Sequence, residues 1–309
     1  MQKISPCLWF DMNCAEAVNF YVSVFPNSKI LATHYYPTDI DFEPFKGMDG
    51  KIVTTIFELD GFTFQALDGG ETFKMNPSVS FMVNFDPSRE KNAQERLDTM
   101  WAKLSEGGEV LMPLQEYPFS KHYGWVQDRF GVSWQLIMTD PDGEPRPNIV
   151  PSVLFVKEVS GKAESALDYY ASLFKNSHLG MVSHYPDGQE QNIKGVMFAE
   201  ANLDGTWIAA MDGGDSHKFA FNEGISFAIE CVDQAEVDYF WNKFVSDGGE
   251  ESQCGWLKDK YGFSWQVVPK RLGEMMKDPD KGKANRALAA MLPMQKLDVA
   301  TLEKAYKGE

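Results

Sequence analysis

The feature that most constrains the fold is a repeat that runs through most of the chain. The stretch GWVQDRFGVSWQLI, which begins at Gly124, returns as GWLKDKYGFSWQVV, which begins at Gly255, with 7 of 14 positions identical. Other stretches recur in the same order: NFYVSVFPNSKI with DYYASLFKNSHL, LDGFTFQALDGG with LDGTWIAAMDGG, and SVSFMV with GISFAI. A repeat of this length indicates a duplicated structural unit. The sequence therefore predicts two similar halves.

A short segment rich in turn-forming residues separates the halves. TDPDGEPRPN, from Thr139 to Asn148, is dense in proline, glycine and aspartate, which disfavour regular structure. The chain has 309 residues, 43% of them hydrophobic, which is enough to give each half a packed core. We predict a first domain at 1–139, a linker at 140–148, a second domain at 149–270 and a helical C-terminal tail at 271–309.

The periodicity within each half predicts β-α-β-β-β units. Apolar residues spaced i, i+3, i+4, i+7 mark amphipathic helices. Such helices are expected at 17–24, 97–104, 166–173 and 237–244. Segments such as KIVTTIFELD, FTFQAL and SVSFMVNF are rich in β-branched and aromatic residues and predict strands.

The composition argues against several functional classes. A formal net charge of -16 repels a phosphate backbone, so no nucleic-acid partner is expected. No apolar run is long enough for a membrane helix and no leader-like segment opens the sequence, so we expect no membrane partner and a cytoplasmic location. The four cysteines form no CxxC pair, which argues against a disulfide framework or a zinc ribbon.

Four ordered segments together resemble a known family: ISPCLWFDMNCAEAVNFY, LDGFTFQALDGG, GWVQDRFGVSWQLI and NRALAAMLPMQKLDVATLEKAY. They are similar to the glyoxalase/bleomycin-resistance, or vicinal oxygen chelate, superfamily and in particular to its PhnB-like branch. The resemblance covers nearly the whole chain. It implies an α+β fold of tandem glyoxalase-like domains, each with two βαβββ modules whose curved mixed sheets surround a cavity, followed by a short helical tail.

The resemblance also points to four positions in each half that hold a metal in metal-binding members. In this sequence they fall at Gln135 and near Pro6, Gln65 and Ser80, and then roughly at Pro151, Ala209, Ser226 and Gln266, with the first-strand positions placed to within a residue or two. Transition metals prefer imidazole, thiolate or carboxylate ligands and bind neutral amides and hydroxyls weakly. We therefore predict no metal and no cofactor.

Several of these polar groups are instead candidates for binding a small molecule. The expected ligand-binding residues are Gln65, Ser80, Trp125, Gln135, Ser226, Trp256 and Gln266. For the two glutamines of the repeat, a second interpretation stays open, in which a buried amide hydrogen-bonds across the sheet and holds the hairpin. For the two tryptophans, packing is equally open. Because Ala209 replaces Gln65 in the second half, the first half, with Gln65, Ser80 and Gln135, is expected to hold the better site.

Other repeated residues have structural interpretations. Trp134 and Trp265 are expected to pack under the helices, on the strand face opposite to Gln135 and Gln266. Asp128 and Asp259 open a predicted hairpin turn, which is a sufficient reason for an aspartate.

The sequence does not assign a role to two histidines and one loop. His34 and His184 occupy corresponding places, where a histidine can act as acid or base; a histidine without chemistry is the expected case. The loop from Pro37 to Gly50 is long and is a candidate lid. No catalytic residue is assigned.

The predicted tail contains apolar residues that are expected to be buried. Leu288, Met291, Leu292 and Leu297 are expected to pack on a domain or on a partner chain. Asp298 is placed to cap a final helix through Thr301.

The leading function is therefore a tandem glyoxalase-like protein that binds a small organic ligand in an apolar cavity, without metal. Two alternatives stay open: a metal-dependent lyase, isomerase or dioxygenase with unrecognised ligands, and a drug-sequestering protein of the bleomycin-binding type. Members of the PhnB-like branch are often labelled demethylubiquinone methyltransferases. The Gly-Gly pairs here follow helices or hairpins, so the sequence lacks the strand-glycine-helix loop that would bind S-adenosylmethionine. Catalysis and homodimer formation are left open.

Overall fold

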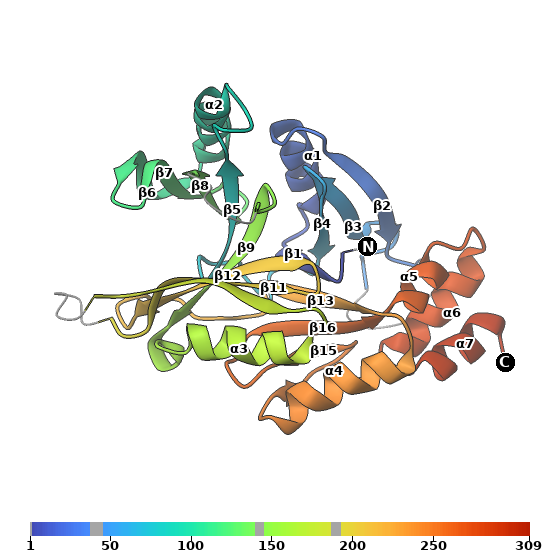
Figure 1. Cartoon of the computed structure of the whole chain (residues 1–309). Helices are drawn as coiled ribbons and strands as arrows, with labels where there is room; N and C mark the ends of the chain where they lie inside the picture. The colour runs from blue at the N-terminus through green and yellow to red at the C-terminus, as the bar shows by residue number, and fades with distance from the viewer. Residues whose placement is uncertain (1, 38–45, 140–144, 187–192) are drawn as a thin grey trace.

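The computed structural model describes residues 2–37, 46–139, 145–186 and 193–309. The chain is a mixed α+β protein whose strands form two eight-stranded curved sheets (Figure 1). Within the described residues, no helix combines the length and the apolar character needed to cross a membrane. The α+β fold of repeated βαβββ modules with a helical tail, expected from the sequence, is confirmed.

Each half contains two βαβββ modules. Module 1 consists of β1 (Ile4–Phe10), α1 (Cys14–Val24), β2 (Lys29–Tyr35), β3 (Ile52–Leu59) and β4 (Phe62–Asp68). Module 2 consists of β5 (Val79–Phe85), α2 (Ala93–Ser105), β6 (Glu109–Tyr117), β7 (Ser120–Gln127) and β8 (Ser133–Met138).

The second half repeats this order. Module 3 consists of β9 (Ile149–Val156), α3 (Ala163–Leu173), β10 (His178–His184), β11 (Val196–Leu203) and β12 (Thr206–Gly214), with a 3-10 turn at Lys157–Val159. Module 4 consists of β13 (Ile225–Cys231), α4 (Gln234–Ser246), β14 (Glu250–Glu251), β15 (Trp256–Lys258) and β16 (Ser264–Pro269). The tail adds α5 (Lys270–Met276), α6 (Lys281–Met291) and α7 (Val299–Lys307).

Each sheet combines one module from each half. Sheet A has the order β14-β15-β16-β13-β1-β4-β3-β2 and therefore joins module 1 to module 4. Sheet B has the order β10-β11-β12-β9-β5-β8-β7-β6 and joins module 2 to module 3. The joints are two antiparallel pairs, β1 with β13 and β5 with β9. In Figure 1 the helices α1 and α2 lie on one side of this assembly, and α3 and α4 lie on the other.

The helices pack on one face of each sheet, here called the helix face. Trp134 and Trp265 are fully buried there, as expected from the sequence. The Trp134 ring lies 5.5 Å from that of Tyr21, on α1, and the Trp265 ring lies 5.2 Å from that of Phe244, on α4. Because side chains alternate along a strand, Ser133, Gln135 and their counterparts point to the other face, here called the open face.

The repeated aspartates close the hairpin turns, as the sequence predicted. Asp128 Oδ1 accepts hydrogen bonds from the backbone N–H groups of Phe130 and Val132, and Oδ2 accepts one from the Trp134 indole at 2.8 Å. Gly131 completes the turn at a φ of 92°, which glycine adopts at little cost. Asp259 makes the same three bonds in the second half.

The tail packs on module 4, as its apolar residues predicted. Leu297 is fully buried in a small core with Leu272, Met275 and Leu302, and Val268 of β16 contacts this core. Gln234, at the start of α4, donates to the Leu297 carbonyl and accepts from the Val299 N–H. Asp298 caps α7 by accepting from the Thr301 N–H at 2.7 Å, which is also confirmed.

We predict that Asp128→Ala lowers the free energy of unfolding by at least about 3 kcal/mol, because it leaves two buried donors and one partly buried donor without an acceptor. Chemical denaturation followed by tryptophan fluorescence measures this. Asp215→Ala, at an exposed aspartate, is the matched control and is expected to stay within about 0.5 kcal/mol of the parent. Equal effects of the two substitutions would contradict the role given to Asp128.

We also predict that a chain ending at Lys270 melts at least about 4 °C below the full chain, since the truncation uncovers Val268 and removes both bonds of Gln234. A chain lacking only Glu309 controls for truncation as such. An unchanged melting temperature and an unchanged oligomeric state after removal of residues 271–309 would show that the tail does not stabilise module 4.

Candidate functional site

The candidate site is a row of four residues that crosses the open face of each sheet. In sheet A the neighbouring strands β4, β1, β13 and β16 carry the row. Strand pairing aligns Cys7 with Gln65 on one side and with Ser226 on the other. Gln266 follows on β16, where its Nε2 donates to Ser226 Oγ at 2.9 Å. The row of sheet A therefore reads Gln65, Cys7, Ser226, Gln266.

The row of sheet B lies on β12, β9, β5 and β8. Ser152 aligns with Ala209 and with Ser80, and Gln135 Nε2 donates to Ser80 Oγ at 2.8 Å. The row of sheet B reads Ala209, Ser152, Ser80, Gln135. The two rows occupy equivalent positions in the duplicated modules.

This arrangement corrects the expected grouping of the candidate residues. Gln65 was expected to converge with Ser80 and Gln135, because all three belong to the first half. The structure places Gln65 in sheet A, with Ser226 and Gln266, because module 1 pairs with module 4. Sequence proximity assigned Gln65 to the wrong partners.

The first-strand positions also need a correction of one residue. Pro6 pairs with Phe227 and Pro151 pairs with Phe81, and both phenylalanines belong to the buried core of the helix face. Since side chains alternate, the next residues, Cys7 and Ser152, point to the open face instead. The row therefore contains a thiol and a hydroxyl where prolines were expected.

The glutamine of sheet B is hydrogen-bonded within the protein at both ends of its amide. Gln135 Oε1 accepts from the Tyr123 hydroxyl at 2.7 Å, while Nε2 bonds to Ser80. Its side chain is only 1% exposed. Trp125, beside it on β7, is tied down by a bond from its indole N–H to Ser133 Oγ at 2.7 Å. In sheet B, the structural interpretation of the repeated glutamine fits the geometry.

Further side chains cover the open face of sheet B. Arg146, just before β9, pairs with Glu200 of β11 at 2.6 Å, and its guanidinium lies 3.6 Å from the centroid of the Trp207 ring. Trp207 packs in turn with Met82 and Val150 in a small apolar cluster that includes Ala209. A ligand would have to displace this packing to reach the row of sheet B.

The equivalent groups of sheet A lack these partners. Cys254 stands where the first half has Tyr123, and no described residue donates to Gln266 Oε1. Within the described part of the chain, the Gln65 amide makes no hydrogen bond, and Ser264 Oγ, the counterpart of Ser133, is buried without one. Buried polar groups in native proteins are normally paired with protein or ordered water. Sheet B also leaves one group of its row, Ser152 Oγ, buried and unpaired, but its glutamine is bonded at both ends, whereas Gln266 of sheet A keeps an open acceptor.

Aromatic rings flank the row of sheet A. Trp256 pairs with Gln266 across β15 and β16 and contacts the Trp9 ring edge to face, with centroids 6.1 Å apart. Trp9 is held by a bond from its indole N–H to the Gly70 carbonyl and packs on Phe73 at 4.9 Å. Both tryptophans are half-buried. The polar row therefore lies beside an apolar wall, the usual composition of a small-molecule site.

The donor set of either row does not fit a transition metal. The row of sheet A holds two amides, a hydroxyl and the Cys7 thiol, and burial raises the pKa of that thiol to about 11. A metal ligand must be the thiolate, which this environment disfavours. The row of sheet B has only hydroxyls, an amide and a methyl group. No cluster of three or more histidine, cysteine or acidic side chains suited to a metal occurs in the described ranges.

The two histidines lie away from both rows. Burial, followed by the nearby Lys277 and Lys281 of the tail, lowers the pKa of His34 below its usual value. His184 is exposed and contacts Glu164 at 2.8 Å. Neither joins a polar row. Most of the candidate lid from Pro37 to Gly50, namely 38–45, lies outside the described residues.

Several groups that decide the character of each row are not marked by any sequence pattern described above: Cys7, Trp9, Tyr123, Arg146, Ser152, Glu200 and Ser264. One signal was available. Tyr123 precedes Gly124 and Cys254 precedes Gly255, where the two copies of the repeated stretch begin. This difference in sequence indicates that the two glutamines have different neighbours. The role of Arg146 was not readable, because it depends on contact between distant segments.

Comparison with known proteins identifies the family. A family model described as 3-demethylubiquinone-9 3-methyltransferase matches residues 2–137 and again residues 147–268. The chain belongs to this family. No curated protein matches the sequence.

Several solved structures are similar to this chain. A Bacillus cereus protein named as a PhnB protein is 36% identical over 45% of this chain and 100% of its own, with a TM-score of 0.39. Glyoxalase I from Zea mays is 12% identical over 86% of this chain and 93% of its own, with a TM-score of 0.52. A Bacillus subtilis protein named as a dioxygenase is 11% identical over 85% of this chain and 83% of its own, with a TM-score of 0.50. The family member expected from the sequence thus has a glyoxalase-like fold.

We predict that untagged, purified protein contains far less than one zinc, nickel, manganese or iron ion per chain, because the rows offer neutral donors. Elemental analysis by mass spectrometry after dialysis measures the metal content. A stoichiometric metal that disappears in Cys7→Ser or Gln266→Leu would contradict this prediction and place the metal on sheet A.

Proposed function

We propose that this family member binds a small organic ligand, without a metal ion, on the open face of sheet A. The observation that carries the proposal is the difference between the two repeated glutamines. Gln135 uses both ends of its amide on Tyr123 and Ser80, whereas Gln266 uses only its Nε2. An accepting oxygen that is left open toward solvent is available to a ligand.

Other groups on the open face of sheet A are also suited to binding a ligand. The Gln65 amide lies at the other end of the row and adds a donor and an acceptor, and Trp9 and Trp256 supply an aromatic surface. Gln266 is 8% exposed, against 1% for Gln135, so it is within reach of a molecule that packs on the tryptophans. We therefore propose Gln65, Gln266, Ser226, Trp9 and Trp256 as the ligand-binding residues.

The remaining candidates have a structural role in this proposal. Ser80 and Gln135 complete a bond network within sheet B, and Trp125 is anchored to Ser133. The better site is accordingly built from module 1 and module 4, rather than from the first half alone as the sequence suggested.

Methyl transfer, which the family description names, finds no support in the residues of this chain. A bound S-adenosylmethionine would need a glycine loop that leads from a strand into a helix N-terminus. Among the described residues, the Gly-Gly pairs follow β4, α2 and α4 or end β12, and none leads directly into a helix. We therefore propose ligand binding and leave methyl transfer out of the function.

The proposal predicts which glutamine a ligand needs. Native mass spectrometry of the full chain identifies small molecules that copurify, and a fragment library screened by ligand-observed NMR provides probes where none does. Gln266→Leu and Gln65→Leu are each expected to weaken binding by about 2- to 13-fold, which corresponds to loss of one neutral hydrogen bond of about 0.5 to 1.5 kcal/mol.

Gln135→Leu is the matched control on sheet B. It is expected to leave affinity unchanged and to lower the free energy of unfolding by about 1 to 3 kcal/mol, because the Tyr123 hydroxyl loses its buried acceptor. If Gln135→Leu abolishes binding while Gln266→Leu leaves it intact, the ligand binds sheet B and the proposal is wrong.

A further inference from the structure

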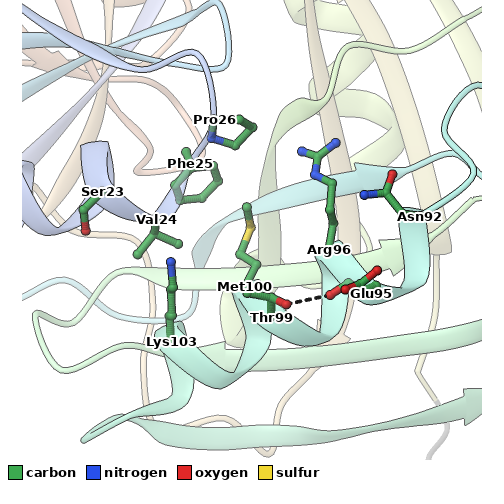
Figure 2. A pocket seen from close by; sticks show the side chains of 10 residues that line it. All are labelled: Ser23, Val24, Phe25, Pro26, Asn92, Glu95, Arg96, Thr99, Met100 and Lys103. Carbon is green, nitrogen blue, oxygen red and sulfur yellow. Dashed lines mark hydrogen bonds between the residues drawn. The ribbon is translucent and has the colours of Figure 1, made fainter.

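A second candidate site lies outside both sheets, in a cleft of about 300 Å³ between α1 and α2 (Figure 2). The end of α1 contributes Val24, Phe25 and Pro26 to its wall, and α2 contributes Thr99 and Met100. In Figure 2 these side chains face one another across the gap between the two helices. Six of the ten lining residues are polar or charged, among them Glu95, Arg96 and Lys103, so the wall is mixed, and the cleft is open to solvent.

In the second half of the chain, aromatic side chains occupy the equivalent space between α3 and α4. Alignment of the repeats places Tyr239 and Phe240 of α4 where α2 has Thr99 and Met100, and Leu173 where α1 has Val24. The Tyr239 hydroxyl donates to the Leu173 carbonyl at 3.0 Å. The Phe240 ring packs on Phe174 with centroids 4.8 Å apart. In the second half, a phenol ring and a phenyl ring of the chain itself occupy the space between the helices.

The first half has an equivalent cleft, but Thr99 stands where the second half has Tyr239. Thr99 turns its hydroxyl back to the Glu95 carbonyl at 2.8 Å and does not reach α1. Among the described residues, no donor reaches the carbonyl oxygen of Val24, which corresponds to that of Leu173. A helix-end carbonyl without a donor in the protein can accept a hydrogen bond from a ligand.

We propose that the α1/α2 cleft binds a small monocyclic phenol, which takes the place that the Tyr239 side chain fills in the second half. Its ring packs on Val24, Phe25 and Met100, and its hydroxyl donates to the Val24 carbonyl. This site is independent of the ligand proposed for sheet A, because none of its lining residues lies on an open face.

The probe is p-cresol, which is the side chain of tyrosine as a free molecule. A ligand with so few atoms is expected to bind with a dissociation constant on the order of millimolar. We expect it to shift the ¹³C-methyl NMR signal of Met100, assigned through Met100→Leu, in the full chain. Toluene, which lacks the hydroxyl, is expected to bind about 2- to 13-fold more weakly.

Thr99→Tyr fills the cleft and is expected to abolish the shift of the Met100 signal. Ala102→Tyr adds the same side chain at an exposed position of α2 that does not line the cleft, and is expected to leave binding unchanged. The reciprocal variant, Tyr239→Thr, opens the second cleft. Millimolar p-cresol should raise its melting temperature more than it raises that of the parent.

Three results would overturn the proposal. The first is a Met100 signal that does not move with p-cresol up to its solubility. The second is binding that persists in Thr99→Tyr. The third is a parent protein that is dimeric in solution and becomes monomeric in Thr99→Tyr, because a second copy would then cover the cleft.

Discussion

The fold depends on two buried carboxylates that hold the hairpin turns at the ends of the two halves. Asp128 and Asp259 are only 4% and 3% exposed. Burial raises the pKa of both above the ordinary value for aspartate, which reflects the cost of placing a charge away from water. Each carboxylate offsets this cost by accepting from two backbone N–H groups and one core indole. The bonds fix the indole on the helix face, and strand alternation then fixes the next residue, Gln135 or Gln266, on the open face.

A second repeated aspartate connects the last strand of module 1 and of module 3 to the helix of the same module. Asp68, at the end of β4, accepts from the Cys14 N–H at the start of α1, and Asp212, at the end of β12, accepts from the Ala163 N–H at the start of α3. Side-chain acceptors at these places satisfy donors that a helix leaves open at its N-terminus. The shared DGG motif at Asp68 and Asp212 therefore has a local structural reason in both halves, while the positions on the open faces differ.

The helices and the faces of individual strands could be predicted from the sequence, whereas the pairing of strands that are far apart in the chain could not. The periodicity located α1 to α4, and the alternation around Gln135 correctly separated its face from that of Trp134. The pairing of β1 with β13 depends on which of several similar strands meet, and a duplicated sequence offers the same strand pattern twice. Gln65 was therefore given the wrong neighbours. The domain limits, the cytoplasmic location and the question of a homodimer stay predictions.

Because the modules are exchanged, the ligand site proposed on sheet A spans the contact between the two ends of the chain. Gln65 belongs to module 1 and Gln266 to module 4, and between them lies the β1–β13 joint. Lys3 reinforces this joint, since its Nζ donates to the Glu230 carbonyl and pairs with Glu236 at 2.7 Å. A ligand that contacts both glutamines binds only when the joint is formed. At a free concentration of 100 times its dissociation constant, such a ligand stabilises the joined state by about 2.7 kcal/mol. Sheet B already pairs both ends of its glutamine with Tyr123 and Ser80, so under the proposed function it gains no such stabilisation.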